Sequence, residues 1–448
     1  MGDEIMGDEM TSRIRWESDT LGEICVPCDC YWGASTQRVL TCLSWGAERF
    51  PAAFIHAFGH QKWASTSANA SLGLLSQAHV MQQAADELSQ GCFDDQVPVT
   101  IWQSGSGTHV HMNINEVLAN RANELLGKPL GSKAPIHPHD HVNLGQSSND
   151  SVPTVMHMTL IQGLEQVLFP GLCLLHGALL EKACLWSDVL KVGRTHLQDA
   201  VSMTVGQEIS AFAEQIAQAQ NRLQQRDEDL YALAQGGTAI GTGINSHPQF
   251  KERFFSFLQQ RTGRPFRSAA HAFAAQSSHD ALISLSGELN TLSGILYKMA
   301  NDFRFLCSGP LCGFGEMNAP ENEPGSSIMP GKVNPTQAEA LLMVAMQVMG
   351  WHHATTLAGI GNFQLNTGKP LIFYNLWTSI TLLAQGITSF ARYFLKDLTV
   401  NEEKLQNAFQ ENPMDLTSQT REHGYEAVAD MIKKKIHLQT HISKDDPS

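Results

Sequence analysis

Apolar residues recur at alternating intervals of three and four along the middle of the chain. The clearest stretch, residues 282–303, places at these intervals Leu282, Leu285, Leu289, Leu292, Leu296, Met299 and Phe303. The spacing predicts an α-helix whose apolar seam packs on other helices. Residues 206–234 repeat an apolar residue every seven positions and predict a second helix. Residues 154–185 predict a third, which the sequence FPG at 169–171 is expected to bend or break.

Two further stretches, residues 338–350 and 370–387, are apolar on nearly every helical face. A helix of this kind is buried on all sides, at the centre of a bundle and often of an oligomeric bundle. Five long helices without a βαβ rhythm predict an all-α fold. A helix of thirty residues is roughly 45 Å long, so we expect these helices to pack against copies of themselves.

The two flanks differ from this helical middle. Residues up to about 145 mix short apolar runs with Gly, Pro and His, and a polar segment begins after about 398. We therefore predict a disordered acidic extension (1–15), an N-terminal domain (16–145), a central helical bundle (146–398) and a small C-terminal domain (399–448).

Composition narrows the classes of function. The hydrophobic content of 42% is that of a folded protein, and the net charge of −14 argues against a nucleic-acid partner. The chain has no run of eighteen apolar residues and no recognisable targeting signal, so we expect no membrane span and a cytoplasmic location. Nine cysteines, an odd number in apolar surroundings, predict reduced thiols within a core.

Two clusters raise the question of a metal. Cys25, Cys28 and Cys30 have no matching second pair of ligands. The sequence HPHDH at 137–141 is dense in histidine, but Pro138 restricts how its side chains can converge. We therefore predict no metal site at either cluster.

Four polar segments lie between the apolar stretches. They are residues 104–113, 145–150, 193–200 and 324–339. Each could be a turn or a helix cap. Together they favour a second interpretation, because hydroxyls, amides and free backbone N–H groups at helix N-termini bind carboxylates or phosphates. In the last segment Lys332 lies just before Pro335, where a helix can begin.

The segment GSSIMPGKVNP at 325–335 resembles the signature of the fumarase/aspartase superfamily. Other stretches resemble the family in the same order, and they are DTLGEICVPCDCYWGASTQR, SGT, NEVLANRANE, HPHDHVN, QSSND, GRTHLQDA, GGTAIGTGIN and GNFQLN. The resemblance implies a three-domain, all-α fold with a central bundle of long helices that assembles into a tetrameric core.

Three positions resemble class II fumarases more than aspartases: His196 in GRTH, Ser148 in SSND and Thr336-Gln337 after KVNP. The resemblance implies reversible hydration of fumarate to (S)-malate through an aci-carboxylate intermediate. Two alternatives stay open, an aspartate ammonia-lyase-type elimination and a catalytically silent structural member of the family.

The resemblance also implies roles for single residues. Ser326 is the expected base, His196 handles the water with Glu339 orienting it, and Lys332 with Asn334 stabilises the aci-carboxylate. The expected substrate-binding residues are Ser106, Gly107, Thr108, Ser147, Ser148, Asn149, Thr195, Ser327, Lys332 and Asn334. The expected accessory carboxylate site is His137, Pro138, His139 and Asp140. The resemblance implies no metal or organic cofactor, a small dicarboxylate substrate, and a homotetramer whose subunits share active sites.

This chain departs from the family at the rim of the expected pocket. It has His109-Val110-His111 where fumarases usually read Gln-Thr-Asn, His139 for an asparagine, and Gln364 for a carboxylate. Residues 420–425 differ too. These changes could alter the catalytic rate or the substrate preference.

Overall fold

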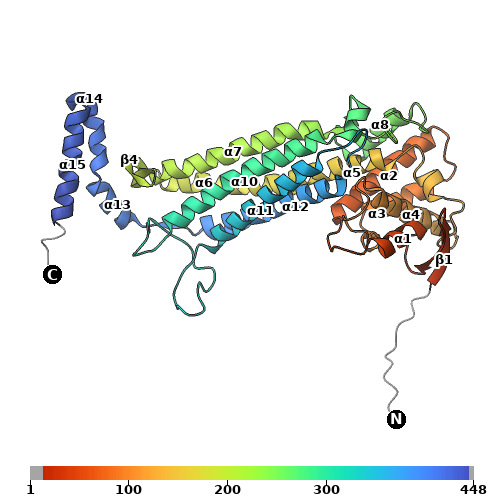
Figure 1. The fold of residues 1–448 in the computed structure, drawn as a ribbon, viewed down its shortest axis with the longest axis horizontal. Coiled ribbons are helices and arrows are strands. Elements are labelled where there is room, and N and C mark those ends of the chain that lie inside the picture. The colour runs from red at the N-terminus through yellow and green to blue at the C-terminus, as the bar shows by residue number, and fades with distance from the viewer. Residues whose placement is uncertain (1–13, 443–448) are drawn as a thin grey trace, which may run out of the picture. The chain divides into compact units, whose positions relative to one another are not determined.

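A computed structural model describes residues 14–442, except for the side chains of 226–227 and 438–442. Most of the predicted acidic extension (1–15) lies outside the described residues. The α-helices are α1 Ala34–Cys42, α2 Ala52–Ser71, α3 Ala78–Ser89, α4 Thr108–Leu125, α5 Ser148–Gly163, α6 Phe169–Leu185, α7 Val205–Leu230, α8 Phe250–Thr262, α9 Ala272–Ser277, α10 Asp280–Leu306, α11 Thr336–Ala358, α12 Lys369–Phe390, α13 Glu402–Glu411, α14 Thr420–His423 and α15 Tyr425–Ile442 (Figure 1). The strands form two-stranded sheets and are β1 Ile14–Asp19 with β2 Gly22–Pro27, β3 Leu190–Thr195 with β4 Gln198–Thr204, β5 Ala232–Leu233 with β6 Arg267–Ser268, and β7 Met317–Asn318 with β8 Thr399–Val400.

The long helices follow the apolar periodicity, and the predicted all-α fold is confirmed. The stretch 282–303 lies within α10, and its seven predicted seam residues are all buried. The stretch 206–234 becomes α7, which ends at Leu230. The two stretches that are apolar all round form α11 and α12.

The sequence FPG does not break the third helix. A π-helical turn, Leu164–Leu168, joins α5 to α6, and Pro170 takes the second position of α6. Proline lacks an N–H and clashes with the carbonyl four residues before it, and the wider π turn accommodates both effects.

This helical run, Ser148–Leu185, is also long and apolar enough to cross a membrane, with a hydropathy of 1.4. The result is weak because it rests on length and composition alone, and the core helix of a soluble bundle passes the same test. The predicted absence of a membrane partner stays a prediction.

The chain divides into two compact units. Unit 1 comprises Met1–Gln166, Leu223–Leu289 and Gly350–Ile380, and unit 2 comprises Val167–Arg222, Asn290–Met349 and Thr381–Ser448. The division into three domains made from the sequence stays a prediction.

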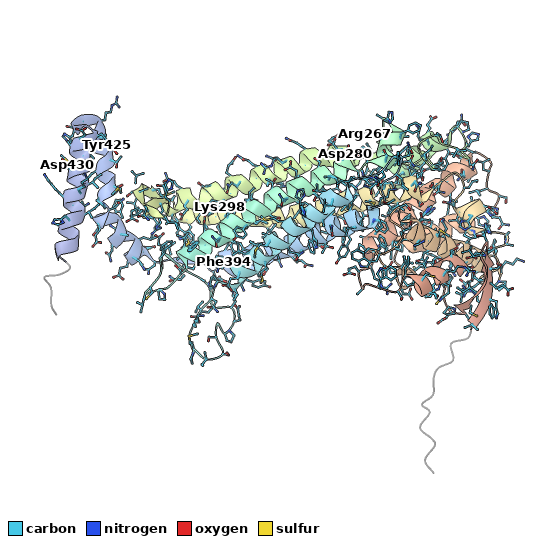
Figure 2. All side chains as sticks on the ribbon, viewed as in Figure 1. Arg267, Asp280, Lys298, Phe394, Tyr425 and Asp430 are labelled. Atoms are coloured by element: carbon cyan, nitrogen blue, oxygen red, sulfur yellow. The ribbon has the colours of Figure 1, made fainter. Side chains whose placement is uncertain are left out.

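Unit 2 has an aromatic core where α7, α10 and α12 pack side by side (Figure 1). The ring of Phe303 on α10 lies 5.6 Å from Phe212 and 5.8 Å from Phe390. Phe394, labelled in Figure 2, stands edge-on to Phe303 at 5.6 Å. Aromatic pairs at these distances contribute beyond the area they bury, so the last turns of α10 and α12 are firmly packed against the first turns of α7.

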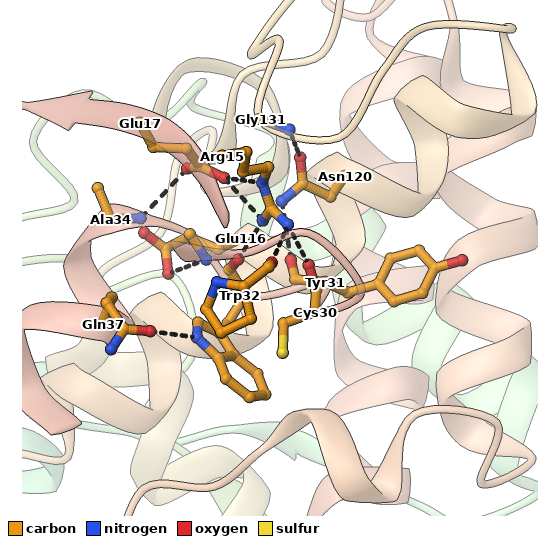
Figure 3. A network of polar contacts seen from close by, with 12 residues as sticks. Arg15, Glu17, Cys30, Tyr31, Trp32, Ala34, Gln37, Glu116, Asn120 and Gly131 are labelled. Carbon is orange, nitrogen blue, oxygen red and sulfur yellow. Dashed lines mark hydrogen bonds and ion pairs between the residues drawn. The ribbon is translucent and has the colours of Figure 1, made fainter. Parts of the chain in front are cut away.

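In unit 1 the buried carboxylate of Glu116 binds the N-terminus of α1 (Figure 3). Glu116 on α4 accepts hydrogen bonds from the backbone N–H groups of Gly33 (2.9 Å), Ser35 (2.8 Å) and Thr36 (3.1 Å). The hydroxyl of Thr36 donates a fourth at 2.6 Å. A carboxylate satisfies the free donors of a helix start and matches its positive end, so α1 is tied to α4.

The expected burial of the cysteines is wrong. All nine thiols are free, but five are exposed and the other four are half-buried. Their apolar neighbours in the sequence belong to helices and loops that present these particular positions outwards in the single chain.

Candidate functional site

A chain of hydroxyl groups joins two helix starts in unit 1. Ser106 Oγ lies 3.0 Å from Ser104 Oγ and 2.6 Å from Thr108 Oγ1. Thr108 Oγ1 in turn lies 2.8 Å from Ser148 Oγ. Thr108 and Ser148 are the first residues of α4 and α5. The positive N-terminal ends of two helices therefore lie together with several hydroxyl donors. Groups of this kind bind carboxylates.

The sequence explains why both helices begin there. Gly107 precedes α4 with φ at 78°, and a Cβ on it would lie 2.8 Å from Val152 Cγ1, so glycine suits both the conformation and the close approach. Ser147 caps α5 in a capping box with Asp150, whose Oδ1 accepts from the Ser147 N–H at 2.9 Å. Asn149 donates from Nδ2 to the carbonyl of Ala239 at 2.8 Å.

Asp150 is fully buried beneath this site, and residue patterns alone did not single it out. Its Oδ2 accepts from the N–H groups of Gly236 (3.1 Å) and Thr238 (2.9 Å). Burial raises the pKa of Asp150 to about 6, although these hydrogen bonds act in the opposite direction. The signal that could have revealed it is its spacing, three residues after the capping serine.

A buried lysine, Lys62 on α2, lies close to one of the rim substitutions. Lys62 Nζ is 2.9 Å from His111 Nε2 and donates to Gln146 Oε1 at 2.9 Å. Burial lowers the pKa of Lys62 to about 7 and that of His111 well below its usual value. His111 therefore serves as a neutral acceptor for Lys62 rather than as a residue of the pocket surface.

The predicted accessory site forms a π-helical turn, Pro138–Val142, capped by His137. His137 Nδ1 accepts from the backbone N–H groups of His139 and Asp140, both at 3.3 Å. Burial lowers the pKa of His137, whereas the Asp140 carboxylate, whose Oδ2 lies 3.2 Å from Nδ1, acts in the opposite direction. Pro138 is buried, whereas the side chains of His139 and Asp140 are exposed.

In unit 2, the predicted catalytic histidine sits on a strained turn. Thr195 pairs with Gln198 at the end of the β3–β4 hairpin, which leaves His196 and Leu197 as a two-residue loop. Their φ values are 53° and 61°. This geometry normally selects Asn or Gly, and strain of this kind is often found at functional sites. The His196 side chain is exposed.

The loop of residues 325–334 is closed on itself. Asn334 donates from Nδ2 to the carbonyl of Gly325 at 2.5 Å, and a Cβ on Gly325 would collide with the Lys332 carbonyl. Ser326 Oγ accepts from the N–H groups of Ile328 (3.2 Å) and Met329 (3.0 Å). These two donors favour negative charge on the oxygen, which suits a serine that acts as a base.

A cavity of about 880 Å³ lies beside this loop. Lys332, Asn334 and Glu339 line it, together with Arg304 of α10. Arg304 Nη2 lies 3.8 Å from Glu339 Oε1, and both side chains are partly exposed. Arg304 was not predicted from the sequence, where it reads only as a basic residue near the end of a helix.

The structure groups the predicted site residues in two sets. Unit 1 contributes the hydroxyl chain, Ser147, Asn149 and the accessory turn, and unit 2 contributes the His196 turn and the loop of residues 325–334 with Glu339. Ser327 and Lys332 are exposed on that loop. Within residues 14–442, no hydrogen bond joins His196 to Ser326 or Glu339, and no group of three or more His, Cys, Asp or Glu side chains could hold a metal ion.

Comparison with known proteins gives a consistent result. A family model described as a lyase matches residues 22–350. A class II fumarate hydratase from Thermosynechococcus vestitus is 50% identical over 95% of this chain and 92% of its own length. A mitochondrial fumarate hydratase from Rhizopus oryzae is 46% identical over 94% of this chain and 86% of its own length.

A solved structure agrees with these relatives. The class II fumarase from Schistosoma mansoni superposes with a TM-score of 0.93 at 39% identity, covering 95% of this chain and 93% of that one. The sequence and the fold therefore agree, and this chain belongs to the lyase family, among its class II fumarases.

Proposed function

We propose that this protein catalyses the reversible hydration of fumarate to (S)-malate. The observation that carries the proposal is the hydroxyl chain of Ser106, Thr108 and Ser148 at two helix N-termini. It provides neutral donors for a substrate carboxylate in a protein whose net charge of −14 would otherwise repel a dianion. Relatives that are fumarate hydratases over almost the whole chain support the same reaction.

In the direction of dehydration, Ser326 removes the proton from the carbon next to a carboxylate. The two N–H groups that donate to Ser326 Oγ support its negative form. The carboxylate then becomes a doubly negative aci-carboxylate. Lys332 and Asn334 stabilise it, because preorganised donors act most strongly where charge develops. Ser327, beside the base, helps to hold the substrate.

His196 then protonates the departing hydroxyl group, and in the forward direction it activates water. Glu339 orients His196 in this proposal. In the single chain Glu339 faces Arg304 instead, so we propose that the His196–Glu339 pair forms between two copies of the chain. Thr195, Ser147 and Asn149 complete the substrate contacts, and residues 137–140 form an accessory carboxylate site.

We also propose a homotetramer that unites the two sets of residues. Apolar side chains on the central helices support it, because Met343, Met346 and Leu357 on α11 and Tyr297 on α10 are exposed in the single chain. Exposed apolar surface of this kind marks an interface. Light scattering should give a mass near four times 49.2 kDa. A monomer that turns over fumarate would contradict the shared site.

We propose a cytoplasmic location for the assembly.

The decisive experiment follows fumarate absorbance with purified protein, with and without ammonia and a chelator. We expect turnover without ammonia, and chelation should not change the rate. Ser326→Ala and His196→Asn should each lower kcat by about 100-fold or more, since general acid–base groups contribute about this much. His79→Asn, an exposed histidine on α3 with no assigned role, is the matched control and should leave the rate unchanged.

The two alternatives give different results. An ammonia-lyase would need ammonia or aspartate for turnover. A silent family member would turn over neither substrate, and Ser326→Ala would then leave its role in the cell intact.

A further inference from the structure

Three helices of unit 1 begin around one short segment, residues 104–108. α4 begins at Thr108, whose hydroxyl lies 2.8 Å from that of Ser148 at the start of α5. α12 begins at Lys369, whose backbone N–H donates to the carbonyl of Gly105 at 3.0 Å. Each helix start carries a partial positive charge, so three partial positive charges lie around this segment.

Lys369 occupies a position that disfavours a lysine. Its side chain is 0% exposed, and Nζ has no hydrogen-bond partner within the described part of the chain. It is also the first residue of α12, where the helix end repels a cation. Burial lowers the pKa of Lys369 to about 8, while Asp150 raises it. An unpaired buried ammonium costs stability, so its presence calls for an anion that the chain itself does not supply.

The groups around Lys369 leave an excess of positive charge. Asp150 on α5 attracts it, but the same carboxylate also attracts Lys62 on α2. Both oxygens of Asp150 are already hydrogen-bonded. His279, next to the start of α10, is neutral, because burial and the charge of Lys369 hold its pKa well below the usual value. One carboxylate therefore balances two buried lysines.

We infer that Lys369 is a positioning residue for dianionic substrates: its buried ammonium, on a helix start whose backbone is hydrogen-bonded to Gly105 in the segment that carries the hydroxyls of Ser106 and Thr108, strengthens the binding of a dicarboxylate through its charge. This inference rests on the proposed function of that hydroxyl site. The substrate dianion supplies the missing counter-charge, and by reciprocity its binding raises the proton affinity of Lys369.

The sign of the pH effect follows from the pKa of Lys369. Below about pH 8 the free enzyme carries the charge and binds a dianion well. Above that pH the lysine is neutral in the free enzyme, so KM for fumarate rises and binding takes up protons. A residue with only a structural role would not couple proton uptake to substrate binding.

The test is Lys369→Met, assayed as the full assembly from pH 7 to 9.5. At pH 7 we expect KM for fumarate to rise by about tenfold, or ~1.4 kcal/mol, with kcat within about twofold. The rise of KM above pH 8 should disappear. The Tm should stay equal or increase, because an apolar side chain replaces an unpaired buried charge.

The matched control is Lys182→Met in unit 2. Lys182 is also buried, but its Nζ donates to the carbonyls of Lys396 and Leu398, both at 2.9 Å. Its loss should lower the Tm and leave KM unchanged at every pH. If Lys369→Met behaves in this same way, the inference is overturned.

Titration calorimetry with succinate, a dianion that does not react, separates this inference from the proposed function. Lys369→Met should weaken succinate about tenfold and its monomethyl ester, a monoanion, about threefold, because the coupling scales with charge. Equal affinities in wild type and variant overturn the inference. If wild type does not turn over fumarate, the proposed function fails, and the succinate titration still decides the role of Lys369.

Discussion

Glu116 offers the sharpest test of how this fold is held together. Its Oε2 accepts three hydrogen bonds, from the N–H groups of Gly33 and Thr36 and from the Thr36 hydroxyl, while Oε1 accepts one from Ser35. Hydrogen bonds to a charged group contribute about 1.5–3 kcal/mol each. The sum of four overestimates the effect, since water can enter and partly replace them.

We expect Glu116→Ala to lower the free energy of unfolding by about 4 kcal/mol, the range found when one partner of a buried charged network is removed. Glu116→Gln should cost about 2 kcal/mol. Its amide oxygen can take the place of Oε2 and keep three bonds, but its NH₂ group then faces the N–H of Ser35, so two donors oppose each other.

The assay is thermal unfolding at matched protein concentration, with hydrogen exchange of residues 33–42 as a local readout. Glu124→Gln on the same helix is the control. The Glu124 carboxylate forms an ion pair with Arg121, and the Glu124 side chain is 41% exposed. Because an exposed ion pair contributes little, Glu124→Gln should lower the free energy of unfolding by less than about 1 kcal/mol. If Glu116→Ala costs no more than this control and exchange in α1 is unchanged, Glu116 does not anchor α1.

Three further outcomes can be checked. Phe303→Ala should cost about 3–5 kcal/mol of stability by leaving a cavity among fully buried rings, whereas the exposed Phe305→Ala should cost less than about 1 kcal/mol; equal shifts in Tm would refute the packing argument. Thr108→Val should raise KM for fumarate by roughly 10- to 100-fold through the loss of one hydrogen bond to a carboxylate, and an unchanged KM would remove Thr108 from the site. Lys62 has a folded-state pKa of about 7, below its unfolded value, so its contribution to stability is present at high pH and is lost as pH falls towards 7. Lys62→Met should therefore flatten the rise of Tm between pH 7 and 10, and an unaltered slope would contradict that pKa.

Much of the proposed site could be predicted from the sequence because its parts are local. A serine three residues before an aspartate, a glycine before a threonine, and a lysine before a proline each specify a helix start or a loop. The structure places all three at such starts. Local pattern could not reveal Arg304 beside Glu339, since these residues lie on different helices and meet only in the fold.

The sequence did not reveal the backbone strain at His196 either. A histidine followed by a leucine carries no turn signature, and the positive φ of both follows from the hairpin that β3 and β4 impose on them. The exposed cysteines illustrate the same limit, because apolar neighbours in the sequence do not decide which face of an element turns inwards.

The sequence by itself determined the long helices, their apolar seams and the motifs that resemble the class II fumarases, because periodicity and helix starts depend on residues a few positions apart. Only the tertiary structure decided which charges are buried. Asp150, Lys62 and Lys369 lie far apart in the sequence, and their altered pKa values arise from burial together in unit 1. Burial depends on the whole fold, so this charge balance beneath the proposed substrate site appears only once α2, α5 and α12 are packed together.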